Sequence, residues 1–577
     1  MRPLHYFLLP LLLSALSLAS PPGYMSIPKF GSSPTVKLDE ATVTGVRGNN
    51  VEKFLGIPFA AAPRFDLPQP IEAYTKSFTA TKYGPACPQQ AITLPLLFAK
   101  LDKWNVVRQI VDKVYTALVL KETSEDCLSL NVIAPRGAEK GDNLPVLAWI
   151  FGGGFEIGGS SQYDGTFIVQ QSLEINNPVI FVSMNYRVSA YGFLAGKEVK
   201  DAHVGNLGLR DQRAALEWIQ KYIQAFGGDP KKVTIWGQSA GAISASLHML
   251  GSGDRNRNLF RGAIMQSGAP IPVGDIKNGQ NDYNTLVKDT RCSKATDTLQ
   301  CLRNVPFEAL KRAVDNSPSF MTHQSLNLAW LPRVDGDFLE DEPQKMVAEG
   351  RVLDLPMISG SCEDEGSVFS LASRSLVATD EDALQYIRST YMPHATRHEM
   401  DRLFELYPMM DVTRRNRRQR GVSSIVFPQQ FQRIAAIQGD LVFQAPRRFF
   451  LKHRSGEQPT WAYRMSRTFT TMPNLGAFHG SDLVDLFPWT QRRILSGNVG
   501  GGYLATYSDL APYFIHFAAE LDPNSPVRDI AKWYPYTPEL RRMLTFHDDG
   551  IEPITTRDDY RSDAMEFMTV LSRKYPM

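Results

Sequence analysis

The chain has 577 residues, of which 43% are hydrophobic and 21% charged, the composition of an ordinary globular protein. Its 62 basic and 60 acidic side chains give a formal net charge of +2, so the basic surface that nucleic acid binding requires is not expected. We find no internal repeat and no linker rich in proline or glycine. We therefore interpret residues 20–577 as a single domain.

The N-terminus has the pattern of a targeting segment. Arg2 precedes an apolar run over about residues 7–18, and the small residues Ser17 and Ala19 stand at the positions that signal peptidases require. The run is shorter than the roughly 20 apolar residues that a membrane span needs. We expect residues 1–19 to be a signal peptide, and the mature protein to be soluble, secreted and extracellular.

Further along the chain, short apolar runs alternate with helical patterns. The predicted strands cover residues 146–151, 179–184, 233–236, 262–266 and 357–359, and the predicted helices cover residues 208–226 and 240–250. Strands that alternate with helices at this spacing predict an α/β fold with a large, mostly parallel sheet flanked by helices on both faces. In such sheets the functional groups lie on loops beyond the carboxyl ends of the strands.

Five cysteines follow the signal peptide, so disulfides are expected in an oxidising compartment. Sequential pairing would join Cys87 to Cys127 and Cys292 to Cys301, closing loops of about 40 and about 10 residues. The sequence alone does not fix this connectivity. Cys362 would be left over, and we expect it to be a small buried hydrophobic residue.

One motif combines a serine with two close glycines. Gly237-Gln238-Ser239-Ala240-Gly241 lies between a predicted strand and a predicted helix. A sharp turn at this place strains the backbone of the serine, exposes its hydroxyl and leaves no room for side chains at the glycines. The context predicts that Ser239 is a nucleophile, which in turn needs a base and an acid that orients the base.

A second glycine-rich segment, Phe151-Gly152-Gly153-Gly154-Phe155, follows the first strong strand. It matches the loop that supplies backbone N–H groups to a developing oxyanion in acyl transfer. A flexible hairpin or a phosphate-binding loop would also be rich in glycine. The G-x-G-x-x-G spacing and the acidic residue about twenty positions later, which mark dinucleotide sites, do not accompany it.

Several longer segments carry a resemblance to a known family. Residues 125–132, 149–155 and 237–241, together with 206–213 and 226–230, resemble the type-B carboxylesterase/lipase family, which includes cholinesterases and the secreted lipases and esterases of fungi. The resemblance extends from about Val36 to the C-terminus. It implies an α/β-hydrolase fold with a disulfide-closed, lid-like loop, and the hydrolysis of carboxylic esters.

The resemblance also implies roles for individual residues. The acid of the family lies in an Asp-Glu-Gly segment, which here is residues 364–366, so that Glu365 is the candidate acid. The base lies in a segment that here is residues 478–482, so that His479 is the candidate base. The order Ser239, Glu365, His479 is the order that this fold requires.

The oxyanion donors of the family fall on the backbone N–H groups of Gly153, Gly154 and Ala240. Its two disulfides fall on Cys87–Cys127 and Cys292–Cys301, the pairing that the sequential arrangement gives. No cofactor is implied. No metal site is expected either, since the H-x-x-x-H and C-x-x-C ligand spacings do not occur.

Two features depart from the family pattern. Gln238 precedes the serine, where many relatives have glutamate, and this change affects local electrostatics without touching a triad role. Arg414–Arg420 is strongly basic, where a neutral loop is usual. We expect a solvated surface loop there; attraction to an anionic interface and proteolytic processing are the alternatives.

Apolar residues recur at steps of three and four between the first two cysteines: Leu97, Leu101, Trp104, Val107, Val111, Val114 and Leu118. They predict an amphipathic helix over residues 96–120. Because the family places its lid in this disulfide loop, residues 88–126 are a candidate lid or pocket wall. A helix packed permanently against the core is the alternative.

The sequence thus predicts a secreted hydrolase that cleaves lipid-like or other apolar esters through an acyl-enzyme on Ser239, with transient contact to lipid interfaces. One alternative is a narrow-specificity hydrolase of small esters. Another is an inactive adhesion or recognition protein, which the filled triad positions disfavour. The sequence predicts no oligomeric state.

Overall fold

A computed structural model describes residues 32–92, 120, 122–250, 258–374, 376–409, 429–468, 473–487, 508–525, 530–548 and 551–577. Residues Pro34–Met577 form one compact unit. The predicted signal peptide (1–19), the predicted helix over 96–120 apart from Leu120, and the basic run Arg414–Arg420 lie outside the described residues. No helix in the described ranges is long and apolar enough to cross a membrane.

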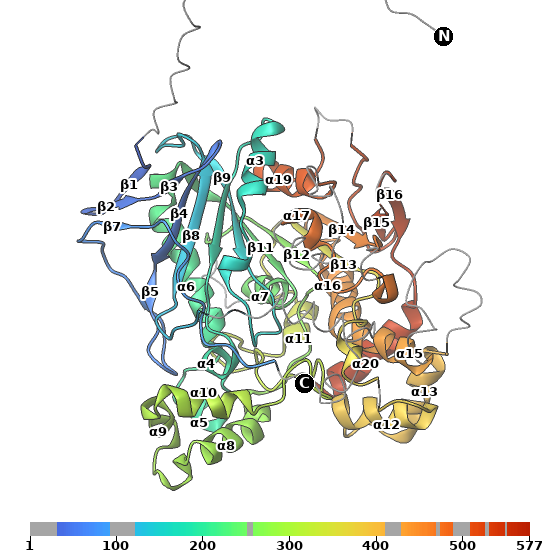
Figure 1. Cartoon of the computed structure of the whole chain (residues 1–577). Coiled ribbons are helices and arrows are strands. Elements are labelled where there is room, and N and C mark those ends of the chain that lie inside the picture. Colours follow the sequence, from blue (N-terminus) through green and yellow to red (C-terminus); the bar gives the residue numbers. More distant parts are fainter. Residues whose placement is uncertain are drawn as a thin grey trace, which may run out of the picture. The chain divides into compact units, whose positions relative to one another are not determined.

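The described residues contain an eleven-stranded sheet (Figure 1). Its strands, in chain order, are β3 (Val46–Arg47), β4 (Val51–Pro58), β8 (Ser129–Pro135), β9 (Leu144–Ile150), β10 (Ile180–Met184), β11 (Gly228–Gln238), β12 (Gly262–Gln266), β13 (Met357–Cys362), β14 (Thr460–Met465), β15 (Arg542–Phe546) and β16 (Ile554–Arg557). Their spatial order is β16-β15-β14-β13-β12-β11-β9-β10-β8-β4-β3. Neighbours from β10 to β15 are parallel, and the pairs at both ends are antiparallel.

Two smaller sheets are formed by residues that precede β8 in the chain. The first contains β1 (Thr35–Leu38), β2 (Ala41–Thr44) and β7 (Phe78–Thr79), and the second contains β5 (Ala60–Ala61) and β6 (Gln69–Pro70).

The helices connect and cover the strands. They are α3 (Thr166–Glu174), α4 (Ser189–Phe193), α5 (Lys197–Asp201), α6 (Leu207–Tyr222), α7 (Ala240–Met249), α8 (Gln280–Asp289), α9 (Thr298–Asn304), α10 (Phe307–Asp315), α11 (Pro343–Ala348), α12 (Asp380–Tyr391), α13 (Arg397–Leu406), α15 (Gln429–Gly439), α16 (Ala445–Arg454), α17 (Leu483–Leu486), α19 (Ala511–Glu520) and α20 (Ser562–Lys574). A π-helical turn, η6 (Asp440–Gln444), joins α15 to α16.

All five predicted strands and both predicted helices form, and the sheet is mostly parallel, as predicted. The strands β9 to β13 are buried almost throughout, apart from residues 229–232 of β11, because helices cover both faces of the sheet. This burial is why they appear in the sequence as continuous apolar runs. The antiparallel strand β4 is only partly buried and β16 is largely exposed, so neither has such a run.

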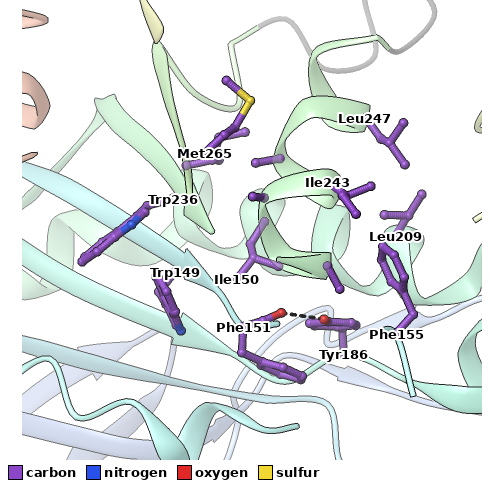
Figure 2. Packing of buried hydrophobic residues seen from close by; sticks show 14 of the residues in the cluster. Trp149, Ile150, Phe151, Phe155, Tyr186, Leu209, Trp236, Ile243, Leu247 and Met265 are labelled. Atoms are coloured by element: carbon purple, nitrogen blue, oxygen red, sulfur yellow. Dashed lines mark hydrogen bonds between the residues drawn. The ribbon is translucent and has the colours of Figure 1, made fainter. Parts of the chain in front are cut away.

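Alternation along the central strands sends neighbouring residues to opposite faces (Figure 2). Trp149 and Trp236 meet edge to face with ring centroids 4.7 Å apart, and Trp236 contacts Phe514 of α19. On the other face, α7 lies so close that its Gly241 approaches the backbone of Ile150. The core is therefore built on both sides of the strands that lead to the site.

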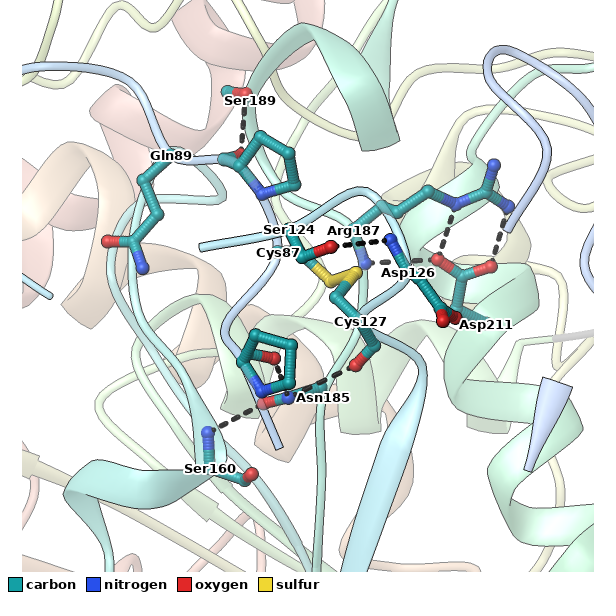
Figure 3. Close-up of a disulfide and its surroundings, with 12 residues drawn as sticks. Cys87, Gln89, Ser124, Asp126, Cys127, Ser160, Asn185, Arg187, Ser189 and Asp211 are labelled. Carbon is teal, nitrogen blue, oxygen red and sulfur yellow. Dashed lines mark hydrogen bonds and ion pairs between the residues drawn. A yellow bond between two sulfur atoms is a disulfide. The ribbon is translucent and has the colours of Figure 1, made fainter. Parts of the chain in front are cut away.

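The structure pairs Cys87 with Cys127 and Cys292 with Cys301, the pairing that the resemblance implies, and Cys362 is buried and free. Figure 3 shows the first disulfide beside Asn185, whose side-chain amide donates to the carbonyl oxygen of Cys127 at 3.1 Å. The same amide donates to the Pro85 carbonyl at 2.9 Å. Both ends of the loop over residues 88–126 are thus attached to the sheet.

Candidate active site

Ser239 lies on a sharp turn between β11 and α7. Its φ of 57° and ψ of −125° are strained values for a residue with a side chain. A Cβ atom on Gly237 would lie 2.3 Å from the backbone of Gly241, and one on Gly241 would lie 2.0 Å from the carbonyl oxygen of Ile150. The two glycines of the motif are required because backbone passes where their side chains would be.

The backbone around Ser239 is fixed by its neighbours. Its N–H donates to the carbonyl of Gln266, at the end of β12, at 2.8 Å. Ala240 is the first residue of α7, so its N–H is one of the donors that a helix leaves without an internal acceptor. The helix N-terminus also favours negative charge beside the serine.

Glu365 follows β13 and is almost completely buried, with 1% of its surface exposed. One of its carboxylate oxygens accepts a hydrogen bond from the N–H of Cys362 at 2.7 Å, and the other lies 2.5 Å from Nδ1 of His479. The neighbouring acid Asp364 accepts from the N–H of Ala477. The structure therefore brings Glu365, of the three acids in this segment, into contact with the histidine.

The ring of His479 lies between two aromatic side chains. Phe443 is 4.4 Å away and Phe369 is 5.1 Å away, measured between ring centroids. Phe443 belongs to the π-helical turn η6, where the extra residue of a π turn redirects side chains and often marks a functional site. The adjacent Gln444 donates to the Cys362 carbonyl at 2.8 Å, which ties this turn to the loop of the acid.

A buried polar network lies behind the histidine. One carboxylate oxygen of Asp482 accepts from the Tyr463 hydroxyl at 2.6 Å and from the side chain of Gln266 at 2.9 Å. The Gln266 side chain also accepts from Trp236 Nε1 at 2.6 Å. Burial raises the pKa of Asp482. Since the backbone of Gln266 holds Ser239, this network joins the strand of the serine to the segment of the histidine.

The glycine-rich loop borders the serine. Gly153 has a φ of 127° and Gly154 a φ of 63°, in the region that glycine adopts readily. A Cβ on Gly152 would lie 2.8 Å from the Cβ of Ser239. Behind the loop, burial raises the pKa of Glu156 well above its usual range, and this side chain accepts from the N–H of Phe320 at 3.0 Å.

Ser239, His479, Gly153, Gly154 and Ala240 line one cavity of about 170 Å³. The rest of the lining is mainly aliphatic and aromatic: Phe155, Ile157, Tyr163, Ile243, Ile271, Phe320, Leu326, Leu328, Leu331, Val368, Phe369, Val442, Phe443, Phe478, Leu483 and Met577. Such a cavity presents a mainly apolar wall beside the Ser239 hydroxyl. Among the described residues, no group of three or more His, Cys, Asp or Glu side chains could hold a metal ion.

These features define the α/β-hydrolase class of protein: the order of the strands, the sharp turn that carries Ser239, and the Glu365–His479 pair that follows β13 and β14. The model of the Carboxylesterase family matches residues 32–568, and the chain belongs to that family, as the resemblance implies. It is a carboxylic ester hydrolase.

Its relatives include secreted fungal lipases. A secreted triacylglycerol lipase of Gibberella zeae is 37% identical over 563 residues, covering 95% of this chain and 92% of the relative. Lipase 4 of Diutina rugosa is 39% identical over 550 residues, covering 93% and 96%. Among solved structures, Aspergillus niger EstA is similar with a TM-score of 0.78 and 26% identity, covering 95% of this chain and 99% of that one.

Sequence patterns alone do not indicate some of the residues that surround the site. The sequence does not indicate that Phe443 contacts the histidine, because the spacing of apolar residues does not distinguish a π turn from the α-helix around it. Asp482 lies in the histidine segment and Glu156 follows the glycine-rich loop, but a role for either depends on contacts with residues far away in the chain. Gln238 was noted as a departure, and the structure places its side chain against His479.

Proposed function

We propose that the chain cleaves carboxylic esters through an acyl-enzyme on Ser239, with His479 as general base and Glu365 as the acid that orients it. His479 takes the hydroxyl proton as Ser239 attacks the ester carbonyl, and then gives it to the leaving alcohol. Water attacks the acyl-enzyme with the help of the same base. The carboxylate of Glu365 stabilises the imidazolium that forms in both steps.

The N–H groups of Gly153, Gly154 and Ala240 are the proposed oxyanion donors. They line the cavity beside Ser239, and two of them belong to glycines whose positive φ orients the peptide groups. Fixed donors aimed at the developing charge supply a large part of the rate enhancement in acyl transfer. The single observation that supports the mechanism most strongly is the 2.5 Å contact between His479 Nδ1 and a buried Glu365 carboxylate in the cavity of Ser239.

The proposed substrates are lipid-like or other apolar esters. The cavity lining consists largely of aliphatic and aromatic side chains, which gain free energy by removing an acyl chain from water, at about 25 cal/mol per Å² of apolar surface. The relatives named as lipases agree with this class. We also propose that the protein is secreted and makes only transient contact with lipid surfaces.

Labelling with a fluorophosphonate probe, followed by mass spectrometry of the modified peptide, tests the mechanism. We expect modification at Ser239 and none in Ser239→Ala. Ser246→Ala is the matched control, since Ser246 lies in α7 with its hydroxyl bonded to the Ile243 carbonyl. Modification elsewhere would contradict the choice of Ser239, and an unmodified wild type would favour an inactive recognition protein.

A panel of nitrophenyl esters of increasing acyl length, triglyceride emulsion and sterol esters tests the substrate class. We expect kcat/KM to rise with acyl length over the short members of the panel. Activity confined to the shortest esters would instead favour the narrow-specificity hydrolase. N-terminal sequencing of protein recovered from the culture medium tests secretion, and we expect the sequence to begin at Ser20 or Pro21.

A further inference from the structure

The two ring nitrogens of His479 have different partners. Nδ1 lies 2.5 Å from a carboxylate oxygen of Glu365, and Nε2 lies 3.2 Å from the side-chain nitrogen of Gln238. An ionised carboxylate only accepts hydrogen bonds, so Nδ1 carries the hydrogen and Nε2 of the neutral ring is an acceptor. The Gln238 amide N–H therefore donates to Nε2.

Acyl transfer requires this same lone pair on Nε2, because it is where the Ser239 proton must go. A neutral imidazole has one such lone pair, so the amide and the serine hydroxyl compete for it. Once Nε2 is protonated, the amide NH₂ group cannot accept from it, and the hydrogen bond is lost unless the amide turns its oxygen away from Gly152 and toward the ring. The contact with Gln238 consequently stabilises the neutral base over the imidazolium.

Strand pairing and two neighbouring glycines define the space around Gln238. It is the last residue of β11, in register with Gln266 of β12, and 4% of its surface is exposed. A Cβ on Gly152 would lie 2.7 Å from its side-chain oxygen, and a Cβ on Gly480 would lie 3.5 Å from its side-chain nitrogen. The glycine at 152 therefore leaves the room that the amide oxygen occupies, whereas a side chain at 480 would meet the amide nitrogen in ordinary contact.

On the basis of the proposed function, we propose that Gln238 is a positioning residue whose amide N–H holds the Nε2 lone pair of neutral His479 in the free enzyme, and that the Ser239 hydroxyl takes this place during acylation. The amide thereby favours neutral His479, the form that can accept the serine proton, at lower pH. It sets the acid side of the pH–rate profile without contacting the reacting carbonyl.

Other ionisable groups also face His479. Glu365 contacts Nδ1, Asp482 lies three residues further along the same segment, and Tyr163 lines the cavity. The two acids favour the imidazolium, and burial raises the pKa of the Tyr163 hydroxyl. Phe369 and Phe443 carry no charge. All of these groups stay unchanged when only residue 238 is varied.

The substitution Gln238→Glu tests the role directly. It keeps the shape of the side chain and replaces a donor by a carboxylate, which accepts from a protonated Nε2 and so favours the imidazolium. An opposite charge at this distance shifts a titration by about 1–3 pH units. We expect the midpoint of the acid limb of kcat/KM, measured on a soluble nitrophenyl ester, to rise by that amount.

Two further variants make the result specific. Gln162→Glu places the same charge in the same cavity, where its oxygen still accepts from the Gly159 N–H, and the midpoint should rise by much less than in Gln238→Glu. Gln238→Met keeps most of the volume without the N–H or a charge, and the midpoint should rise by less than in Gln238→Glu. The pH dependence of fluorophosphonate labelling, which involves no substrate KM, should show the same order.

NMR of selectively labelled histidine, with His479 assigned through His479→Gln, follows protonation in the free protein without any activity. A His479 titration unmoved or lowered in Gln238→Glu, or raised equally in Gln162→Glu, would overturn the role of Gln238. If Gln238→Glu fails to fold, Gln238→Met takes its place. A His479 titration that is unmoved or lowered in Gln238→Met would then overturn the role of Gln238. A wild type that fluorophosphonate leaves unlabelled at Ser239 would instead overturn the proposed function.

Discussion

The serine side of the site and the acid–base side are held in different ways. Ser239 lies on a turn whose shape is dictated by backbone contacts, with glycines where the chain passes itself. Glu365 and His479 lie on segments beyond β13 and β14, where side-chain hydrogen bonds and aromatic contacts hold them. The serine side should therefore tolerate loss of a functional group but not added volume. The acid–base side should respond to changes of polarity that leave the shape intact.

The largest expected effect comes from Ser239→Ala. Removing the hydroxyl leaves the turn intact, so kcat should fall by about 10⁵–10⁶-fold while the melting temperature stays near that of the wild type. Ester hydrolysis and calorimetry on the same preparation measure both quantities. A variant that retains most of its activity would show that the nucleophile is elsewhere.

On the acid–base side, Glu365→Gln should lower kcat by about 10³–10⁴-fold with little change in KM. A neutral amide cannot stabilise the imidazolium, although it fits the same space. Glu363→Gln is the matched control and should have a mild effect. The reverse order of the two variants would contradict the choice of Glu365 among the three acids of this segment.

Added volume tests the serine side. Gly241→Ala should destabilise the fold by more than about 3 kcal/mol, because its Cβ would lie 2.0 Å from the Ile150 carbonyl oxygen and backbone must move. Gly456→Ala is the control, since the nearest heavy atom to its Cβ would be 3.9 Å away. Urea denaturation of both variants gives the comparison, and equal stabilities would show that the turn yields more easily than its geometry indicates.

The smallest expected effect concerns a buried histidine on the serine side, in α7. Burial lowers the pKa of His248 to about 3, below its usual 6.5. At a pH between these two pKa values, the His248 imidazole binds a proton in the unfolded chain but not in the folded chain. The free energy of unfolding therefore falls as the pH falls below 6.5. His248→Gln should flatten this decline, whereas the exposed His323→Gln should not. Melting temperatures between pH 7 and pH 4 give the two slopes, and parallel slopes would remove His248 as a cause.

The same contrast explains how much the sequence could predict. The turn around Ser239 was predictable because its glycines, strand and helix are neighbours in the chain. The central strands were predictable because burial on both faces leaves continuous apolar runs. Glu365 and His479 were inferred only through family resemblance, since their contact joins residues 114 positions apart. The contact between Gln238 and His479 could not be predicted, because the direction of the side chain at the end of β11 depends on a partner 241 positions away.

The late position of His479 in the chain has a consequence for biosynthesis. A nascent chain that has passed β12 already holds the serine turn and the glycine-rich loop, but the base is still more than 200 residues from being made. Parallel strands far apart in sequence also pair slowly. If His479 is the base, as proposed, an incomplete chain cannot hydrolyse esters, and enzymatic activity reports the pairing of the late strands β14 and β15 as well as of the early ones.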